Sequence, residues 1–152
     1  MRTVELLPDP VLSAAVRELW DRLRAAGLRS LATHGHPTNR PHVTLGRVDR
    51  LDTIPELRLP IPVSLREVRV LGRALVWAVV PTPELETVRD AVGRSLVVVG
   101  SGEWVPHVSL ALKMPADQRA AALNLLGDVG PVCGQLVGAR SYDPETRTVT
   151  EL

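Results

Sequence analysis

Apolar residues follow two periods along this chain, one typical of strands and one typical of helices. A short apolar run at 3–7 ends at a proline, and helical spacing follows at Leu12, Val16, Leu19 and Leu23. Asp9 and Pro10 stand where a helix N-cap and first residue would lie, and Gly27 stands where the helix would end. The pattern therefore predicts a strand followed by a helix.

The same pattern returns in the second half of the chain. Thr82 and Pro83 repeat the cap and the proline, and one helical face follows at Leu85, Val88, Val92 and Leu96. Two strand–helix–strand units predict an α+β fold with two lobes related by a pseudo-twofold axis, in which antiparallel sheets surround a central cleft. We expect one domain over 1–152, with the first repeat at about 1–72 and the second at about 73–152, because no linker rich in Gly or Ser separates them.

Further elements are expected between and after these units. They are a strand at 28–33, a hairpin with strands at 61–71 and 74–80, a helix at 115–126, and a terminal hairpin with strands at 132–141 and 146–151. In the helix at 115–126, the spacing of Ala120, Leu123 and Leu126 predicts an inward face.

Each repeat also carries one copy of a five-residue pattern, Pro41-His42-Val43-Thr44-Leu45 in the first and Pro106-His107-Val108-Ser109-Leu110 in the second. Side chains alternate between the two faces of a strand. The histidine and the hydroxyl residue of each copy therefore share one face. Two such strands that meet across a cleft would bring two imidazoles and two hydroxyls together.

That set of groups suits transfer at phosphorus. Histidine has an ordinary pKa of about 6.5, so one ring can be neutral and the other charged near neutral pH. The neutral ring can accept a proton from water or a ribose hydroxyl, while the charged ring protonates the leaving oxygen. The hydroxyls of Thr44 and Ser109 can hold the non-bridging phosphate oxygens. This scheme needs neither a metal nor a cofactor.

The two motifs resemble the twin His-x-Thr/Ser motifs of the 2H phosphoesterase superfamily, and in particular its 2′-5′ RNA ligase-like branch of RNA 2′,3′-cyclic phosphodiesterases. The resemblance extends over almost the whole chain. It implies metal-independent opening of a 2′,3′-cyclic phosphate, or a related transfer on small nucleotides or RNA ends. It further implies that His107 activates the water and His42 protonates the leaving ribose oxygen, although the pseudo-symmetry permits the reverse.

Residues beside the motifs are candidate substrate contacts. By strand alternation, Arg40 shares the face of the first motif and is favoured over Arg47, and Lys113 shares the face of the second if that strand stays regular. Trp104 and Tyr142 are candidates for stacking on a base, as aromatic residues near the motif strands often do in the superfamily. The alternative for each cation is a solvated charge, and for Trp104 a partly buried ring.

Two other functions remain open. His34 and His36, followed by His42, could ligate a metal, although no Asp or Glu stands at a useful spacing and the segment has the composition of a turn. The same cleft could also serve as a binding module for a nucleotide or RNA end with little turnover.

The composition of the chain limits the classes of molecule that it is expected to bind. A net charge of +1 and an aromatic content of 3% argue against a polyanion-binding field and against a platform for single-stranded nucleic acid. Cys133 is the single cysteine, and no segment has the pattern of a secretory signal or a membrane span. We expect a cytoplasmic monomer without an obligate protein partner, acting on a small nucleotide or RNA end that carries a cyclic phosphate.

Overall fold

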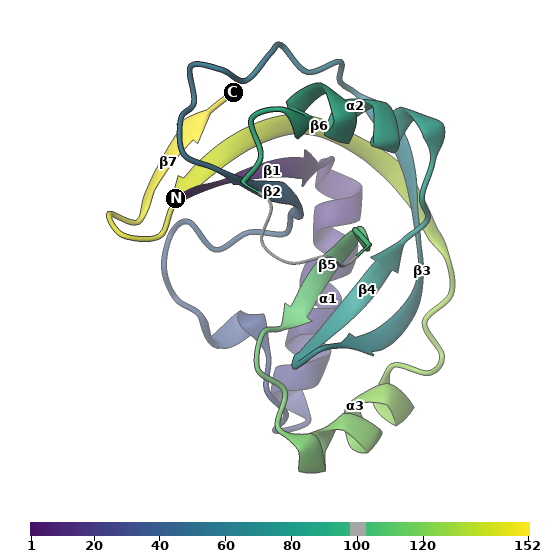
Figure 1. Ribbon diagram of the computed structural model, residues 1–152. Helices are drawn as coiled ribbons and strands as arrows, with labels where there is room; N and C mark the ends of the chain where they lie inside the picture. The colour runs from purple at the N-terminus through teal and green to yellow at the C-terminus, as the bar shows by residue number, and fades with distance from the viewer. Residues whose placement is uncertain (98–102) are drawn as a thin grey trace.

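Within residues 1–97 and 103–152, which the computed structural model describes, seven strands form one antiparallel sheet in the order β1-β2-β5-β4-β3-β6-β7 (Figure 1). The predicted α+β class with antiparallel strands is confirmed. The elements, in chain order, are β1 (Arg2–Pro8), α1 (Pro10–Ala25), the 3-10 helix η1 (Leu31–Thr33), β2 (Val43–Val48), β3 (Ile61–Leu71), β4 (Ala74–Val79), α2 (Pro83–Gly93), β5 (His107–Ala111), the 3-10 helix η2 (Ala116–Gln118), α3 (Arg119–Leu125), β6 (Val132–Asp143) and β7 (Thr148–Glu151).

The order β1-α1-β2-β3 in the first part of the chain is matched by β4-α2-β5-β6 in the second. The third strand of each set pairs with the first strand of the other set: β3 pairs with β4, and β6 pairs with β1. β3 and β6 also pair with each other, and β2 meets β5. Six strands therefore form a closed ring in which each half of the chain completes the other, and β7 extends it from β6.

Both long helices begin at the predicted caps. The Asp9 carboxylate accepts a hydrogen bond from Leu12 N–H at 2.7 Å, and the Thr82 hydroxyl accepts one from Leu85 N–H at 3.2 Å. A proline follows each cap, where its missing N–H leaves no bond unmade. Gly27, with φ of +75°, turns the chain just after α1. None of the helices in the described part of the chain has the length and apolarity needed to span a membrane.

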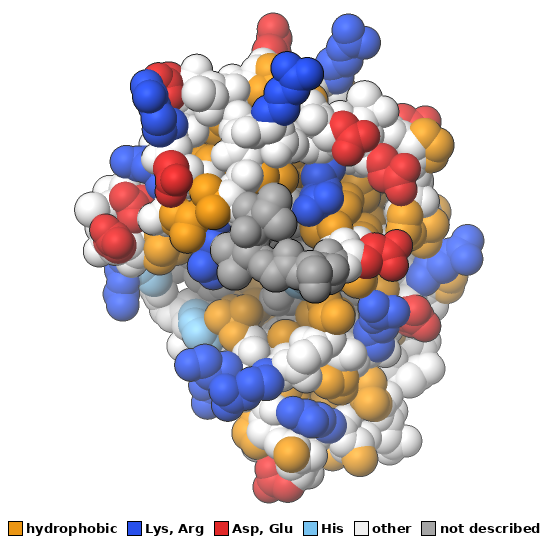
Figure 2. All heavy atoms as spheres, in the orientation of Figure 1, with side chains coloured by type: hydrophobic (Ala, Val, Ile, Leu, Met, Phe, Trp, Pro, Cys, Tyr) orange, Lys and Arg blue, Asp and Glu red, His pale blue; other side chains and the backbone are white. Residues whose placement is uncertain are grey.

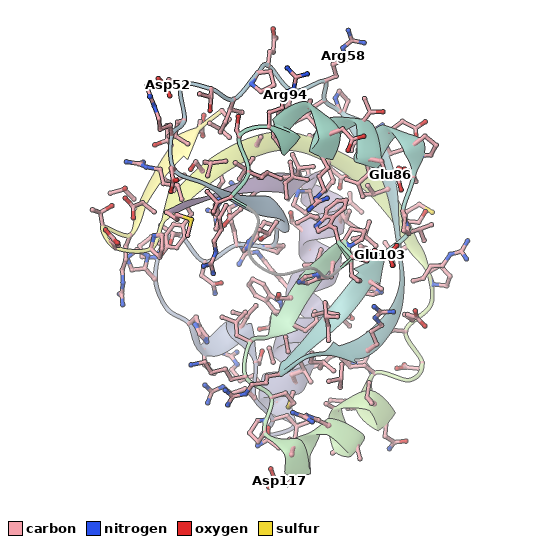
Figure 3. The ribbon with its side chains drawn as sticks, viewed as in Figure 1. Asp52, Arg58, Glu86, Arg94, Glu103 and Asp117 are labelled. Atoms are coloured by element: carbon pink, nitrogen blue, oxygen red, sulfur yellow. The ribbon has the colours of Figure 1, made fainter. Side chains whose placement is uncertain are left out.

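The helices pack their apolar faces on the sheet and fix the backs of the motif strands. α1 crosses behind β5 (Figure 1), and its buried Trp20 donates its ring N–H to the Ser109 carbonyl at 3.1 Å. Arg89 on α2 donates to the Leu45 carbonyl of β2 at 3.3 Å. The opposite face of α2 is exposed; Glu86 points outward from it, and so does Arg94, which directly follows the helix (Figure 3). Each motif strand is thus held from behind by the helix of the other half.

The strand predicted at 28–33 is wrong, because this segment contains the 3-10 helix η1. Ser30 explains the difference. Its buried hydroxyl donates to the Trp20 carbonyl at 2.6 Å and accepts from Ala32 N–H at 3.0 Å. These bonds satisfy the backbone locally and curl the chain after Ser30.

The helix predicted at 115–126 exists, but only Leu126 of the three residues predicted to face inward is buried. Ala120 and Leu123 are exposed, whereas Ala122 and Leu126 are buried. The segment starts as the 3-10 helix η2 and becomes α-helical only at Arg119. The buried residues Ala122 and Leu126 are four positions apart, which places both on one face of the helix.

Removal of the Asp9 cap (Asp9→Ala) should lower the free energy of unfolding by about 1–2 kcal/mol. The N–H groups of Leu12 and Gln135 hold the pKa of the Asp9 carboxyl below its ordinary value. A pKa lowered by folding stabilises the protein above the unfolded-state pKa of about 3.9, and this contribution disappears as the pH falls through the folded-state pKa. Urea unfolding at several pH values should show the difference between wild type and Asp9→Ala shrinking in acid.

Thr82→Ala is the matched control, because the second cap is uncharged. Its loss of stability should stay nearly constant over the same pH range. An Asp9→Ala difference that stays equally constant would contradict the role of the carboxylate.

Candidate active site

The two motif strands lie next to each other in the sheet. Val43 of β2 pairs with Val108 of β5 in antiparallel register. Residues that face each other across such a pair lie on the same side of the sheet. In this register, the residues on either side of Val43 lie opposite the residues on either side of Val108. His42 is therefore opposite Ser109, and Thr44 is opposite His107. The four predicted groups therefore converge from two strands, with each imidazole facing the hydroxyl of the other motif.

Both imidazoles are oriented in the same way. Nδ1 of His42 bonds the Arg40 carbonyl at 2.8 Å, and Nδ1 of His107 bonds the Val105 carbonyl at 2.7 Å. A carbonyl only accepts, so Nδ1 carries the proton and Nε2 of the neutral ring keeps its lone pair. The proline between each histidine and its acceptor restricts the preceding residue to an extended backbone. Each motif thus presents a ring with Nε2 available for proton transfer.

A β-bulge in β2 changes which arginine reaches the site. Glu5 of β1 pairs with Thr44, but the preceding Val4 pairs with Gly46, so Leu45 is an extra residue. Beyond the bulge the alternation of faces is reversed. Arg47 therefore lies on the same face as Thr44, which simple alternation did not predict. Arg40 precedes the start of β2, and its contact with the site is its backbone carbonyl.

The second motif strand has the same irregularity. Val76 of β4 pairs with Ser109, whereas Leu75 pairs with Ala111, so Leu110 is the extra residue. The face predicted for Lys113 is wrong for this reason, and because β5 ends at Ala111. Lys113 is exposed and does not line the site, and Leu112 takes the position that Arg47 has in the first repeat.

A cavity of about 790 Å³ opens over this part of the sheet. On the surface in Figure 2, histidine side chains are visible among Lys and Arg side chains. Three of the four motif residues line the cavity, namely His42, Thr44 and Ser109, while His107 is half-buried and is not among the described residues that line it. The other polar and charged side chains on its wall are Thr3, Glu5, His34, His36, Thr38, Asn39, Arg47, Arg140, Tyr142 and Arg147.

The two predicted aromatic contacts have different surroundings. Tyr142 lies on β6 and lines the cavity. Trp104 does not line it in the described part of the chain. Its ring N–H donates to the Thr44 carbonyl at 3.3 Å, and the guanidinium of Arg89 lies 4.7 Å from the ring centroid. Trp104 thus packs against the first motif strand, which agrees with its alternative reading as a partly buried ring.

A buried ion pair that the sequence reasoning missed forms part of the cavity wall. Glu5 and Arg140 are 3% and 5% exposed, and Nε of Arg140 donates to Oε1 of Glu5 at 2.7 Å. The Thr3 hydroxyl donates to Oε2 at 2.7 Å, and the same oxygen lies 3.6 Å from Nε2 of His42. A signal existed in the sequence, because a carboxylate inside an apolar strand is rarely buried without a partner.

His34 and His36 lie in the loop before the first motif and line the cavity together with His42. Within residues 1–97 and 103–152, no three His, Cys, Asp or Glu side chains are grouped as metal ligands. Nδ1 of His36 is also engaged within the loop, because it accepts a hydrogen bond from Thr38 N–H at 3.2 Å.

Comparison with known proteins identifies a common fold. The crystal structure of the MHV ns2 PDE domain is similar, with a TM-score of 0.53 and 18% sequence identity. The alignment covers 89% of this chain and 99% of that domain. No protein-family model and no curated protein matches the sequence. The likeness therefore shows that this chain shares the fold of that domain.

The hydrogen bonds at Nδ1 predict which tautomer each neutral ring adopts. Long-range ¹H–¹⁵N spectra of the protein with labelled histidines should show His42 and His107 as Nδ1–H tautomers. His36 is the internal control, because its Nδ1 accepts a bond and its neutral ring should carry the proton at Nε2. Nε2–H signals from both motif histidines would contradict the orientation described above.

Proposed function

We propose that this protein is a metal-independent phosphodiesterase that opens a 2′,3′-cyclic phosphate on a small nucleotide or an RNA end. The observation that carries the proposal is the meeting of the two motifs at Val43 and Val108, with both imidazoles held at Nδ1 by a backbone carbonyl. Two rings in this orientation provide a base and an acid within one site. The fold shared with the MHV ns2 PDE domain supports the same class of reaction.

The proposed reaction is an in-line displacement at phosphorus. Nε2 of neutral His107 takes a proton from water as the water oxygen bonds to phosphorus. The bond from phosphorus to one ribose oxygen breaks, and Nε2–H of protonated His42 gives its proton to that oxygen. The product is a ribose phosphomonoester, and exchange with solvent returns each ring to its starting state. Hydroxyls of Thr44 and Ser109 donate to the non-bridging oxygens as charge develops there.

Positive side chains on the cavity wall support an anionic substrate. Arg47 and Arg147 are exposed and reach the cavity from β2 and from the turn between β6 and β7. Tyr142 has a ring on the same wall and is the aromatic residue proposed to contact a base. A cavity of about 790 Å³ is within the range of roughly 300–1,000 Å³ that holds ligands of nucleotide size. A small nucleotide or a terminal nucleotide of RNA is the substrate class proposed.

The cellular location and the oligomeric state are predicted from the sequence. We propose a cytoplasmic enzyme that acts as a monomer, since both motifs of the site come from one chain. Binding without turnover is the alternative function, and it would use the same cavity.

The activity should be measurable as hydrolysis of 2′,3′-cyclic mononucleotides in the presence of a chelator. His42→Ala and His107→Ala should each lower kcat by roughly 10²–10⁴-fold, which is the usual contribution of general acid–base catalysis. Thr44→Val and Ser109→Ala should lower kcat by about 10²-fold through loss of a donor to the phosphate oxygens.

Three results would contradict the proposal. Activity that chelation abolishes and added metal restores would favour the metal site at His34 and His36. Full activity in both histidine variants would remove the motifs from catalysis. Tight binding of the cyclic nucleotide with no product formed would favour the binding module.

The bulge in β2 leads to a separate prediction about substrate binding. Arg47→Leu should raise KM by about fivefold to tenfold with a smaller effect on kcat, since a charged hydrogen bond contributes about 1–2 kcal/mol. Lys113→Leu is the matched control, because Lys113 lies outside the cavity wall and its removal should leave KM unchanged. Equal effects of the two substitutions would show that only the overall positive charge matters.

A further inference from the structure

The two halves of the site differ in charge at one buried position beside the motifs. Thr44 of the first motif pairs with Glu5 of β1, and the equivalent Ser109 of the second motif pairs with Val76 of β4. The strands that pair with β1 and β4 on their other side, β6 and β3, are also equivalent in the two repeats. Glu5 pairs with Arg140, and Val76 pairs with Arg69. The chain therefore has an arginine on both sides but a carboxylate only beside the first motif.

This difference places a negative charge next to one imidazole. Oε2 of Glu5 lies 3.6 Å from Nε2 of His42. His107 forms no contact of this kind with a carboxylate in the part of the chain that the structure describes. An opposite charge at this range favours the protonated form of a ring.

Glu5 differs in charge from the other ionisable groups that line the cavity around His42. His34 and His36 line the same cavity from the loop before the first motif, and arginines line it from three elements: Arg47 on β2, Arg140 on β6 and Arg147 in the turn before β7. Among the described residues that line the cavity, Glu5 is the single carboxylate. It is therefore the group that can offset the positive charges around a protonated His42.

The contacts of Glu5 hold it in place as a fixed charge. Nε of Arg140 donates to Oε1 at 2.7 Å, and the Thr3 hydroxyl donates to Oε2 at 2.7 Å. Arg140 is anchored in turn, because its second guanidinium nitrogen donates to the Thr38 carbonyl at 2.8 Å. The distance from Oε2 to Nε2 of His42 exceeds a hydrogen bond. The proton on Nε2 therefore remains free to move to a substrate oxygen.

We propose that Glu5 is a positioning residue that makes the two histidines unequal, by favouring protonated His42 as the general acid and leaving His107 as the base. The proposal rests on the proposed phosphodiesterase function for its catalytic part. Glu5 touches no reacting atom, and it acts through the imidazole beside it. The assignment of acid and base then follows from a charge that one repeat has and the other lacks.

The first test follows the protonation of both rings by NMR and needs no substrate. In Glu5→Gln, the His42 ring should lose its proton at a lower pH than in wild type, and the His107 ring should titrate as before. Glu67→Gln is the matched control, since it removes an exposed carboxylate paired with an arginine on β3. Unchanged titration of His42 in Glu5→Gln, or an equal change at His107, would overturn the proposal.

Loss of Glu5 leaves the buried Arg140 without its partner, which can unfold the protein. The double variant Glu5→Gln/Arg140→Gln removes both charges together and provides a second folded background. The change at His42 is expected there in the same direction but smaller, because the positive charge of Arg140, which opposes protonation of the ring, is removed together with the carboxylate. A His42 ring that keeps its proton to a higher pH in this variant than in wild type would also overturn the proposal.

The second test compares two cyclic substrates that differ in the leaving atom. A ribose oxygen needs a proton as it leaves, whereas a sulfur in its place leaves as a thiolate. With the oxygen substrate, Glu5→Gln should lower kcat by about 10- to 100-fold, a part of the roughly 10²–10⁴-fold expected from general acid catalysis. With the sulfur substrate, Glu5→Gln and His42→Ala should both be close to wild type, while His107→Ala stays impaired.

The outcomes separate the two proposals. Failure of wild type to cleave either substrate would sink the phosphodiesterase function, and the NMR titration would still decide the role of Glu5. Equal loss on both substrates in Glu5→Gln would mean that Glu5 serves only the fold. Sulfur rescue of His107→Ala in place of His42→Ala would reverse the assignment of acid and base.

Discussion

The site depends on a single point of contact between two strands. β2 and β5 pair at Val43 and Val108, and the side chains on either side of this pair make up the candidate catalytic set. One residue pair gives little stability by itself, so other contacts must fix the register. These contacts include two hydrogen bonds from tryptophan rings. Trp20 donates to the Ser109 carbonyl, and Trp104 donates to the Thr44 carbonyl. Because each half of the chain supports the motif strand of the other, the site forms only when both halves are folded.

The exchange of β3 and β6 has the same consequence for the whole sheet. Each of these strands leaves its own repeat and pairs with the first strand of the other. The closed ring that results satisfies strand edges that an isolated repeat would expose. Neither repeat could therefore bury its apolar face or complete its hydrogen bonds alone. The sequence is organised as two repeats, but the two repeats fold together as one unit.

Local patterns in the sequence predict much of this arrangement, since caps, turns and motif alternation depend on neighbouring residues. The starts of both helices at Asp9 and Thr82 are examples. Features that depend on a partner strand were missed. The bulge at Leu110 exists only relative to β4, and it removes Lys113 from the predicted face. The pair of Glu5 and Arg140 joins residues 135 positions apart, which no local period can reveal.

A duplicated site raises a chemical problem that its symmetry cannot solve. General acid–base catalysis needs one ring with a proton and one without, but the two motifs hold their rings through equivalent Nδ1 bonds. The difference must then come from residues outside the motifs. Position 5 and its counterpart Val76 differ in charge where the strands are otherwise equivalent, and both are buried where solvent screens little. If the proposed role of Glu5 holds, a single replacement in one copy of a repeat is enough to give two similar histidines opposite roles.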